Sequence, residues 1–204
     1  MISASDVKQI IIRDFENCLK SLTDISYDPS NNAYVVIEDS VQFHSYDDIV
    51  QRVYQTEKGN GKKKEETSED NPRSPDMILF EKDSVVFVEF KNGKINDKVR
   101  DNIKVKAIEG GIIILYNIIS KYIKDVTFLD TVQLKKTYFL VYNKTKNPIP
   151  KDSRERIHNH SSTNRIRFGL DIYKGTFFYE VGTFTGKGFL FWLKRKGFLS
   201  KGPI

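Results

Sequence analysis

The chain is poor in cysteine and in long apolar segments. Cys18 is the only cysteine among 204 residues, which excludes an internal disulfide and a cysteine-rich zinc site. The longest apolar run, residues 110–116, is far shorter than the roughly 18 residues that a membrane span requires. Asp6 and Lys8 stand just before the first apolar run, which is not the pattern of a secretory signal. We therefore expect a cytoplasmic protein without a membrane segment.

The sequence motifs of several common enzymes are also missing. No GxxxxGKS or GxxxxGKT segment is present, which argues against ATP use, and no GxSxG elbow supports a Ser–His–Asp triad. Histidine occurs only at His44, His158 and His160. Because the last two have no cysteine and no third histidine nearby, we interpret them as loop residues and not as a metal site.

Positive charge is in excess. The formal net charge is +6 and the pI is about 9.2, which suggests a polyanionic partner. Residues 151–167 hold five basic residues against two acidic ones, and residues 187–201 hold five and no acid, interleaved with aromatic residues. Such a pattern is typical of a surface that follows a phosphate backbone, although a solvated C-terminus would give it equally. The candidate nucleic-acid contacts here are Lys194, Arg195 and Lys196.

Hydrophobic periodicity predicts a mixed α/β or α+β fold. The length and composition suit one domain, residues 1–204, with a basic C-terminal extension from about residue 153. The expected helices are residues 6–22, about 45–56, and 96–124, the last bent or weakened at Gly110 and Gly111. The expected strands are residues 33–38, a hairpin within 74–94, residues 132–142, and two further strands, 166–173 and 175–181. The strand after the long helix should join the sheet by a crossover.

Residues 57–74 separate the second helix from the hairpin. They contain no large apolar residue, and their five basic and five acidic residues cancel in charge. This composition predicts a flexible loop without a core of its own. Lys62, Lys63 and Lys64 are candidate contacts to a phosphate backbone, whereas a solvated loop would also account for them.

The hairpin carries charged residues where a buried sheet is expected. Because side chains alternate along a strand, Glu89 and Lys91 share one face with Val85 and Phe87. If the turn is Asp83-Ser84, Asp76 lies opposite Lys91; if it is Lys82-Asp83, Asp76 lies opposite Glu89. In both registers Asp76 projects on the Glu89 face, and only a three-residue loop would break this parity.

Two carboxylates at cross-strand distance repel each other, and a divalent cation between them would offset that repulsion. Oxygen ligands favour Mg²⁺ or Mn²⁺ over zinc. Beside such an ion, Lys91 could orient a water or neutralise charge that builds on a phosphate. The arrangement would suit hydrolysis of a phosphodiester. A salt-bridged hairpin end, in which Lys91 pairs with Asp76, is the simpler structural interpretation.

Pro75-Asp76, twelve further residues, and then Glu89-Phe90-Lys91 resemble the motif of the PD-(D/E)XK nuclease superfamily. The resemblance covers residues 74–142 and implies a restriction-endonuclease-like core of bacterial or phage type, a mixed central sheet flanked by helices. It implies Mg²⁺-dependent cleavage of DNA, or less often of RNA. Asp76, Glu89 and the Phe90 carbonyl would be metal ligands, and Lys91 would position water or stabilise charge.

The same resemblance implies an acidic residue from the first helix and a basic residue from the helix after the hairpin. Glu16 is the candidate for the first role, and Asp14 and Glu38 are the other options. For the second role Lys106 is preferred to Lys104, because helical spacing places Lys106 on one side with Asn102 and Glu109. A solvated glutamate and a surface lysine are the competing interpretations.

The sequence thus predicts a metal-dependent endonuclease that acts on DNA. The rival prediction is a catalytically inactive, nuclease-like module that binds nucleic acid or a protein partner. A homodimer is compatible with either. Defence against phage, recombination and repair all fit a nuclease of this kind.

Overall fold

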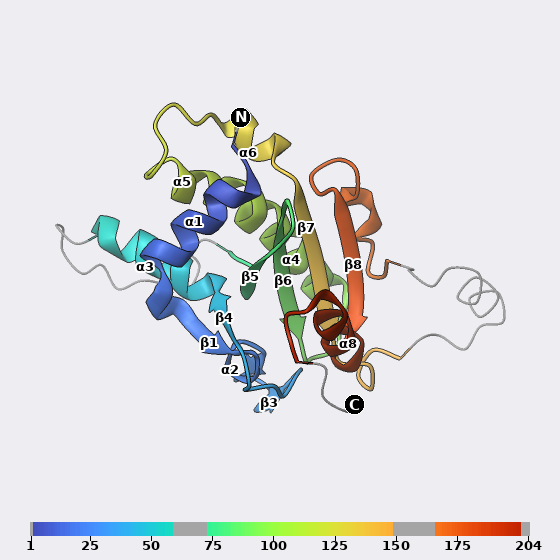
Figure 1. Cartoon of the computed structure of the whole chain (residues 1–204). Coiled ribbons are helices and arrows are strands. Elements are labelled where there is room, and N and C mark those ends of the chain that lie inside the picture. Colours follow the sequence, from blue (N-terminus) through green and yellow to red (C-terminus); the bar gives the residue numbers. More distant parts are fainter. Residues whose placement is uncertain (1, 59–72, 149–165, 201–204) are drawn as a thin grey trace.

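A six-stranded mixed sheet forms the centre of the protein (Figure 1). The computed structural model describes residues 2–58, 73–148 and 166–200. In spatial order the strands are β1 Leu19–Ser21, β4 Gln42–Ser45, β5 Met77–Glu81, β6 Ser84–Lys91, β7 Lys136–Tyr142 and β8 Glu180–Thr185. The neighbours from β1 to β6 are antiparallel, whereas β6, β7 and β8 are parallel. The predicted mixed central sheet, flanked by helices, is confirmed.

The register of the β5–β6 hairpin decides between the two predicted turns. Glu81 pairs with Ser84, so the turn consists of Lys82 and Asp83, and Lys82 adopts a positive φ of 51°. Met77 pairs with Val88. The next position on each strand therefore places Asp76 opposite Glu89, as one of the two alternatives required.

The two faces of the sheet have separate cores. Val85 and Phe87 pack with helix α1 Ala4–Asp14, helix α3 Tyr46–Lys58 and helix α4 Asp97–Ile108. Val86, Val88 and Phe90 pack with helix α8 Gly186–Lys196 on the other face. Figure 1 shows α8 in front of the sheet and α4 behind it. Glu89 and Lys91 belong to the α4 face by strand alternation.

The crossover from β6 to the parallel strand β7 contains the helix predicted over 96–124, which forms in three parts and ends at Ile119. Asn96 caps α4, a π-helical turn η2 spans Glu109–Ile114, and helix α5 spans Leu115–Ile119. A Cβ at Gly110 would lie 2.2 Å from Pro75 Cδ. The glycine at the π-turn therefore lets α4 approach the residue just before Asp76. A short helix, α6 Phe128–Gln133, precedes β7, so the strand predicted from residue 132 begins only at Lys136.

The N-terminal predictions are partly wrong. The helix predicted over 6–22 ends at Asp14 and is followed by a 3-10 turn, Glu16–Cys18, the strand β1 and a short helix α2, Leu22–Ile25. Phe15, Cys18 and Leu22 are nevertheless buried, so their spacing reflected the core and not one helix. The strand predicted over 33–38 is limited to β3 Ala33–Tyr34, which pairs with β2 Tyr27–Asp28 in a separate small hairpin. The strand β4 was not predicted.

The helix predicted from Ser45 is confirmed as α3, and the backbone N–H of Asp48 donates to the Ser45 hydroxyl at 3.3 Å. At the C-terminal end, residues 166–173 form no strand but a loop and a 3-10 turn, η3 Asp171–Tyr173. The strand predicted over 175–181 begins only at Glu180. Leu170 and Phe178 lie within these segments and are buried in the core on the α4 face, which explains the apolar pattern.

Several predictions fall on residues outside the described part of the chain. These are the loop lysines Lys62, Lys63 and Lys64, the pair His158 and His160, and most of the first basic stretch. Among the helices of the described ranges, none combines the length and the apolar character needed to cross a membrane.

Candidate active site

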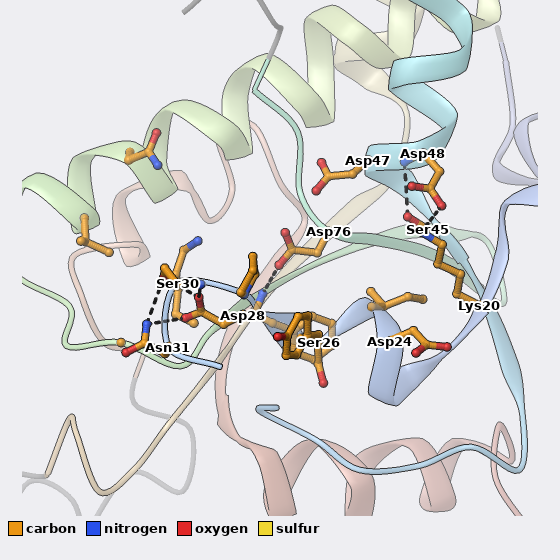
Figure 2. A pocket seen from close by; sticks show the side chains of 18 of the residues that line it. Lys20, Asp24, Ser26, Asp28, Ser30, Asn31, Ser45, Asp47, Asp48 and Asp76 are labelled. Atoms are coloured by element: carbon orange, nitrogen blue, oxygen red, sulfur yellow. Dashed lines mark hydrogen bonds and ion pairs between the residues drawn. The ribbon is translucent and has the colours of Figure 1, made fainter. Parts of the chain in front are cut away.

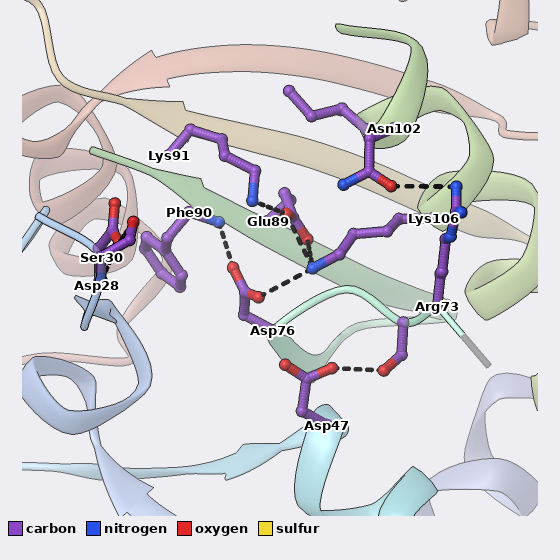
Figure 3. A network of polar contacts seen from close by, with 12 residues as sticks. Asp28, Ser30, Asp47, Arg73, Asp76, Glu89, Phe90, Lys91, Asn102 and Lys106 are labelled. Atoms are coloured by element: carbon purple, nitrogen blue, oxygen red, sulfur yellow. Dashed lines mark hydrogen bonds and ion pairs between the residues drawn. The ribbon is translucent and has the colours of Figure 1, made fainter. Parts of the chain in front are cut away.

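Asp76 and Glu89 converge on the α4 face of the sheet (Figure 3). Asp76 stands immediately before β5, and its Oδ2 accepts a 2.5 Å hydrogen bond from the backbone N–H of Phe90. Glu89 lies within β6 with a side chain that is 0% exposed. The strand pairing and the Phe90 hydrogen bond therefore fix both carboxylates relative to each other. This is the juxtaposition that the hairpin parity predicted.

Two ammonium groups neutralise this pair of carboxylates. Lys106 Nζ lies 3.5 Å from Asp76 Oδ1 and 3.1 Å from Glu89 Oε1. Lys91 Nζ lies 2.7 Å from Glu89 Oε1. Figure 3 shows Lys106 between the two acids, with Lys91 on the far side of Glu89. The predicted side of α4 is confirmed, since Asn102 and Glu109 lie on it and bind the side chain and backbone N–H of Arg73, respectively.

A third carboxylate, that of Asp47, belongs to the same cluster. Asp47 lies in the first turn of α3 and accepts a hydrogen bond from the hydroxyl of Ser74, two residues before Asp76. Sequence reasoning did not select it. The sequence did signal a helix start at Ser45, which puts Asp47 in the first turn of that helix. The preceding strand β4, which carries this turn to the cluster, was not predicted.

Burial and mutual repulsion oppose the ionisation of the acids in this cluster. Burial, and then the charge of Glu89, raise the pKa of Asp76 from 3.8 to about 7, although Lys106 acts in the opposite direction. Burial also raises the pKa of Asp47. For Lys91 and Lys106, burial lowers the pKa, but the neighbouring carboxylates outweigh it and raise both values overall. Both lysines are therefore protonated at neutral pH, and three acids share two ammonium groups.

A cavity of about 510 Å³ opens beside this cluster. Asp47, Asp76 and Lys91 line one side of it, and residues of the β2–β3 hairpin line the other. Figure 2 shows Asp47 and Asp76 near α3 and the start of β5, with Asp28 and Ser30 across from them. Glu89 does not line the cavity, and its side chain is fully buried. The cavity gives a small polar ligand access to Asp76 and Lys91.

The other predicted acidic residues lie elsewhere. Glu16 is exposed on the 3-10 turn and does not line the cavity. Asp14 pairs with Arg13, and Glu38 accepts hydrogen bonds from Ser40. The structure therefore does not bring Glu16 into the cluster, and the third acid near Asp76 is Asp47.

Among the residues that the structure describes, the other basic residues predicted as nucleic-acid contacts lie away from the carboxylates. Lys104 is half-buried on α4 close to Gly169, away from Lys106. Lys194, Arg195 and Lys196 lie on α8, which covers the opposite face of the sheet from Glu89. Lys196 forms an ion pair with Glu81, at the turn end of the hairpin. These α8 residues are therefore remote from the carboxylates.

The chemistry of the donor set fits a hard divalent cation. Glu89 Oε1 is buried and, within the described residues, accepts no hydrogen bond of normal geometry, although two ammonium groups lie within 3.1 Å. Carboxylate oxygens are the donors that Mg²⁺ and Mn²⁺ prefer. In the arrangement seen, no three acidic, histidine or cysteine side chains of the described ranges surround one metal position. Lys106 lies between the acids instead.

Comparison of the chain with protein-family models, with curated proteins and with solved structures found no match. The function must therefore be argued from the site itself.

Proposed function

We propose that the protein is a metal-dependent nuclease with a restriction-endonuclease-like core, which hydrolyses phosphodiester bonds of DNA. One observation carries the proposal: Asp76 and Glu89 meet from adjacent antiparallel strands, with two ammonium groups, beside an accessible cavity. The adjacent antiparallel strands β4, β5 and β6, followed by helix α4 and the parallel strand β7, support that core. A purely structural ion pair would need neither the third acid nor the cavity.

Asp76, Glu89 and Asp47 are the side chains that would hold Mg²⁺ or Mn²⁺, and the Phe90 carbonyl stays a predicted further ligand. When bound, the ion would supply positive charge to the phosphate and lower the pKa of a water. The chain itself fixes the acids. The Phe90 N–H orients Asp76, the Ser74 hydroxyl orients Asp47, and β6 holds Glu89.

Lys91 and Lys106 would act as electrostatic groups. In hydrolysis a water oxygen forms a bond to phosphorus, the bond from phosphorus to the leaving sugar oxygen breaks, and negative charge builds on the phosphate. Because their acidic neighbours keep both lysines protonated, neither can accept the proton of the attacking water. Each instead stabilises the developing charge or positions the water. The proton of the attacking water leaves to solvent, and the leaving oxygen takes a proton from solvent.

A second candidate function is a nuclease-like module that binds nucleic acid without cutting it. The position of Lys106 favours this candidate, because its ammonium group already neutralises both carboxylates. Calorimetry of Mn²⁺ binding, combined with a cleavage assay on plasmid and single-stranded DNA, separates the two. The nuclease binds Mn²⁺ and cleaves with Mg²⁺ or Mn²⁺ but not with EDTA. An inactive module binds DNA, takes up no Mn²⁺ and leaves every substrate intact.

A further inference from the structure

The β2–β3 hairpin presents an exposed aromatic pair beside the candidate active site. Tyr27 and Tyr34 are directly paired across the hairpin, with ring centroids 5.0 Å apart, and they are 40% and 48% exposed. Tyr27 lines the same cavity of about 510 Å³ that Asp76 and Lys91 line. The aromatic pair therefore lies beside the same cavity as Asp76 and Lys91, although these residues come from distant parts of the sequence.

Polar contacts hold this hairpin in place. The Tyr27 hydroxyl donates to Asn32 Oδ1 at 3.0 Å, and Asn31 Nδ2 donates to Asp28 Oδ2 at 2.8 Å. Lys146 Nζ, which follows β7, donates to Asn31 Oδ1 at 2.9 Å. The hydrogen bond from Lys146 thus connects the hairpin that carries the aromatic pair to the chain just after β7. A ring fixed before binding loses little conformational entropy when a ligand stacks on it.

Three carboxylates that line the cavity, those of Asp24, Asp28 and Asp48, each have a hydrogen-bond or ion-pair partner. Asp28 accepts hydrogen bonds from Ser30 and Asn31, and Asp48 pairs with Lys20 at 2.6 Å (Figure 2). Asp24 accepts a hydrogen bond from the Ser21 hydroxyl. Lys94 lines the cavity, is exposed, and has no ion pair with any residue that the structure describes. An anionic group in the cavity would meet Lys94 and Lys91 as its cationic partners.

We propose that this cavity accepts an unpaired nucleotide of single-stranded DNA, with its base stacked on Tyr27 and its phosphate toward Lys94 and Lys91. Base stacking on aromatic side chains is the usual way in which proteins hold single strands. The faces of paired bases are covered within a duplex, so only an unpaired or extruded base could use this aromatic pair. A cavity of about 510 Å³ suits one small ligand. The inference rests on the proposed nuclease function and names its substrate class.

The alternative is a purely structural role, because a cross-strand tyrosine pair also stabilises a hairpin. Two substitutions at one position separate the roles. Tyr27→Val keeps an apolar, strand-compatible side chain without a π-face, whereas Tyr27→Phe keeps the ring and loses the hydroxyl. Tyr179→Ala is the matched control, since Tyr179 is an exposed tyrosine that does not line the cavity.

The test measures fluorescence anisotropy of a labelled oligothymidylate and of a labelled duplex, in Ca²⁺ to prevent cleavage. We expect Tyr27→Val to weaken single-strand binding about 5- to 150-fold, the range of one base stack. Tyr27→Phe and Tyr179→Ala should stay within about twofold of wild type, and duplex binding should change less than single-strand binding. Circular dichroism and thermal unfolding verify that each variant is folded.

Unchanged single-strand affinity in a folded Tyr27→Val variant would overturn the stacking site. Equal losses for duplex and single strand would overturn it too. A cleavage assay on the same oligonucleotide, with Mg²⁺ and with Asp76→Asn as the inactive reference, reports the nuclease function separately. Cleavage that depends on Asp76, together with unchanged Tyr27→Val binding, would leave the nuclease proposal standing without the aromatic site. Absence of both cleavage and binding in wild type would remove both proposals.

Discussion

The ammonium group of Lys106 contacts both carboxylate oxygens of Glu89, at 3.1 Å from Oε1 and 3.2 Å from Oε2. The same group also lies 3.5 Å from Asp76. Lys106 thus lies where the two acids meet and, together with Lys91 on Glu89, offsets their repulsion. The sequence predicts a divalent cation for this offsetting role, Lys91 as the residue that positions water or stabilises charge, and Lys106 as the basic residue of the helix after the hairpin. Because Lys106 contacts both acids and Lys91 contacts only Glu89, Lys106 would compete with a metal ion more than Lys91 would.

Replacing Lys106 with methionine should change metal affinity and stability in opposite directions. Without the competing ammonium group, Mn²⁺ should bind about tenfold more tightly or better, as calorimetry would show. In EDTA the variant should lose about 3 kcal/mol of unfolding free energy, because two buried carboxylates keep only Lys91. Saturating Mn²⁺ should restore much of this loss. Lys104→Met, on the same helix near Gly169, is the control and should change neither the Mn²⁺ affinity nor the stability. Weaker Mn²⁺ binding in Lys106→Met would contradict the competition.

Replacing Lys91 should slow cleavage without removing the metal. Lys91 contacts Glu89 alone among the acids at 2.7 Å, so Lys91→Ala should keep Mn²⁺ binding and substrate binding and yet cleave very slowly. Lys91→Arg should restore little, because the guanidinium spreads its charge over a bulkier planar group. Calorimetry beside single-turnover cleavage measures both properties. Complete loss of Mn²⁺ binding in Lys91→Ala would make the residue a structural support of the hairpin.

The raised pKa of Asp76 predicts a pH-dependent stability difference in EDTA. Its pKa rises from an ordinary 3.8 to about 7 on folding, so between these values the folded state binds more protons than the unfolded state. Wild-type stability should therefore fall as pH rises through this window. Asp76→Asn keeps an oxygen that can accept from the Phe90 N–H but lacks the charge. Its stability relative to wild type should increase steadily from pH 4 to about 7 in urea unfolding. A difference that stays constant with pH would refute the assignment.

The strand parity of the hairpin made the central pair predictable from the sequence. A two-residue turn and side-chain alternation were sufficient to place Asp76 on the Glu89 face in either register. The choice of register depended on Lys82 taking a positive φ, which a lysine rarely adopts and its sequence does not signal. The bend at Gly110 was also predictable, although only the contact with Pro75 shows why the glycine is needed.

The third acid was not predictable, because it depends on tertiary packing. Asp47 follows a four-residue strand too short for a periodic signal, and Ser74 reaches it from 27 residues away. Glu16 looked suitable because residues 6–22 were treated as one helix. The turn at Phe15 ends that helix early and leaves Glu16 exposed. The same reliance on apolar spacing produced the strand predicted over 166–173.

These placements predict different effects for the two acids. Asp47→Asn should weaken Mn²⁺ binding and slow cleavage by about tenfold or more, since a half-buried carboxylate near Asp76 is lost. Glu16→Gln should leave both within about twofold of wild type, because Glu16 is outside the cavity. Calorimetry and initial cleavage rates on one substrate provide the comparison. The reverse ranking would return Glu16 to the site and remove Asp47 from it.

The most direct measurement is the single-turnover rate of cleavage of one single-stranded oligonucleotide by wild type and by Asp76→Asn, with Mg²⁺ and with EDTA. Asp171→Asn, which changes an exposed aspartate outside the cavity, is the matched control. We expect Mg²⁺-dependent cleavage by wild type and by Asp171→Asn, and a rate roughly a thousandfold lower for Asp76→Asn, about 4 kcal/mol of transition-state stabilisation. Equal rates for wild type and a folded Asp76→Asn variant, or cleavage that persists in EDTA, would contradict the account.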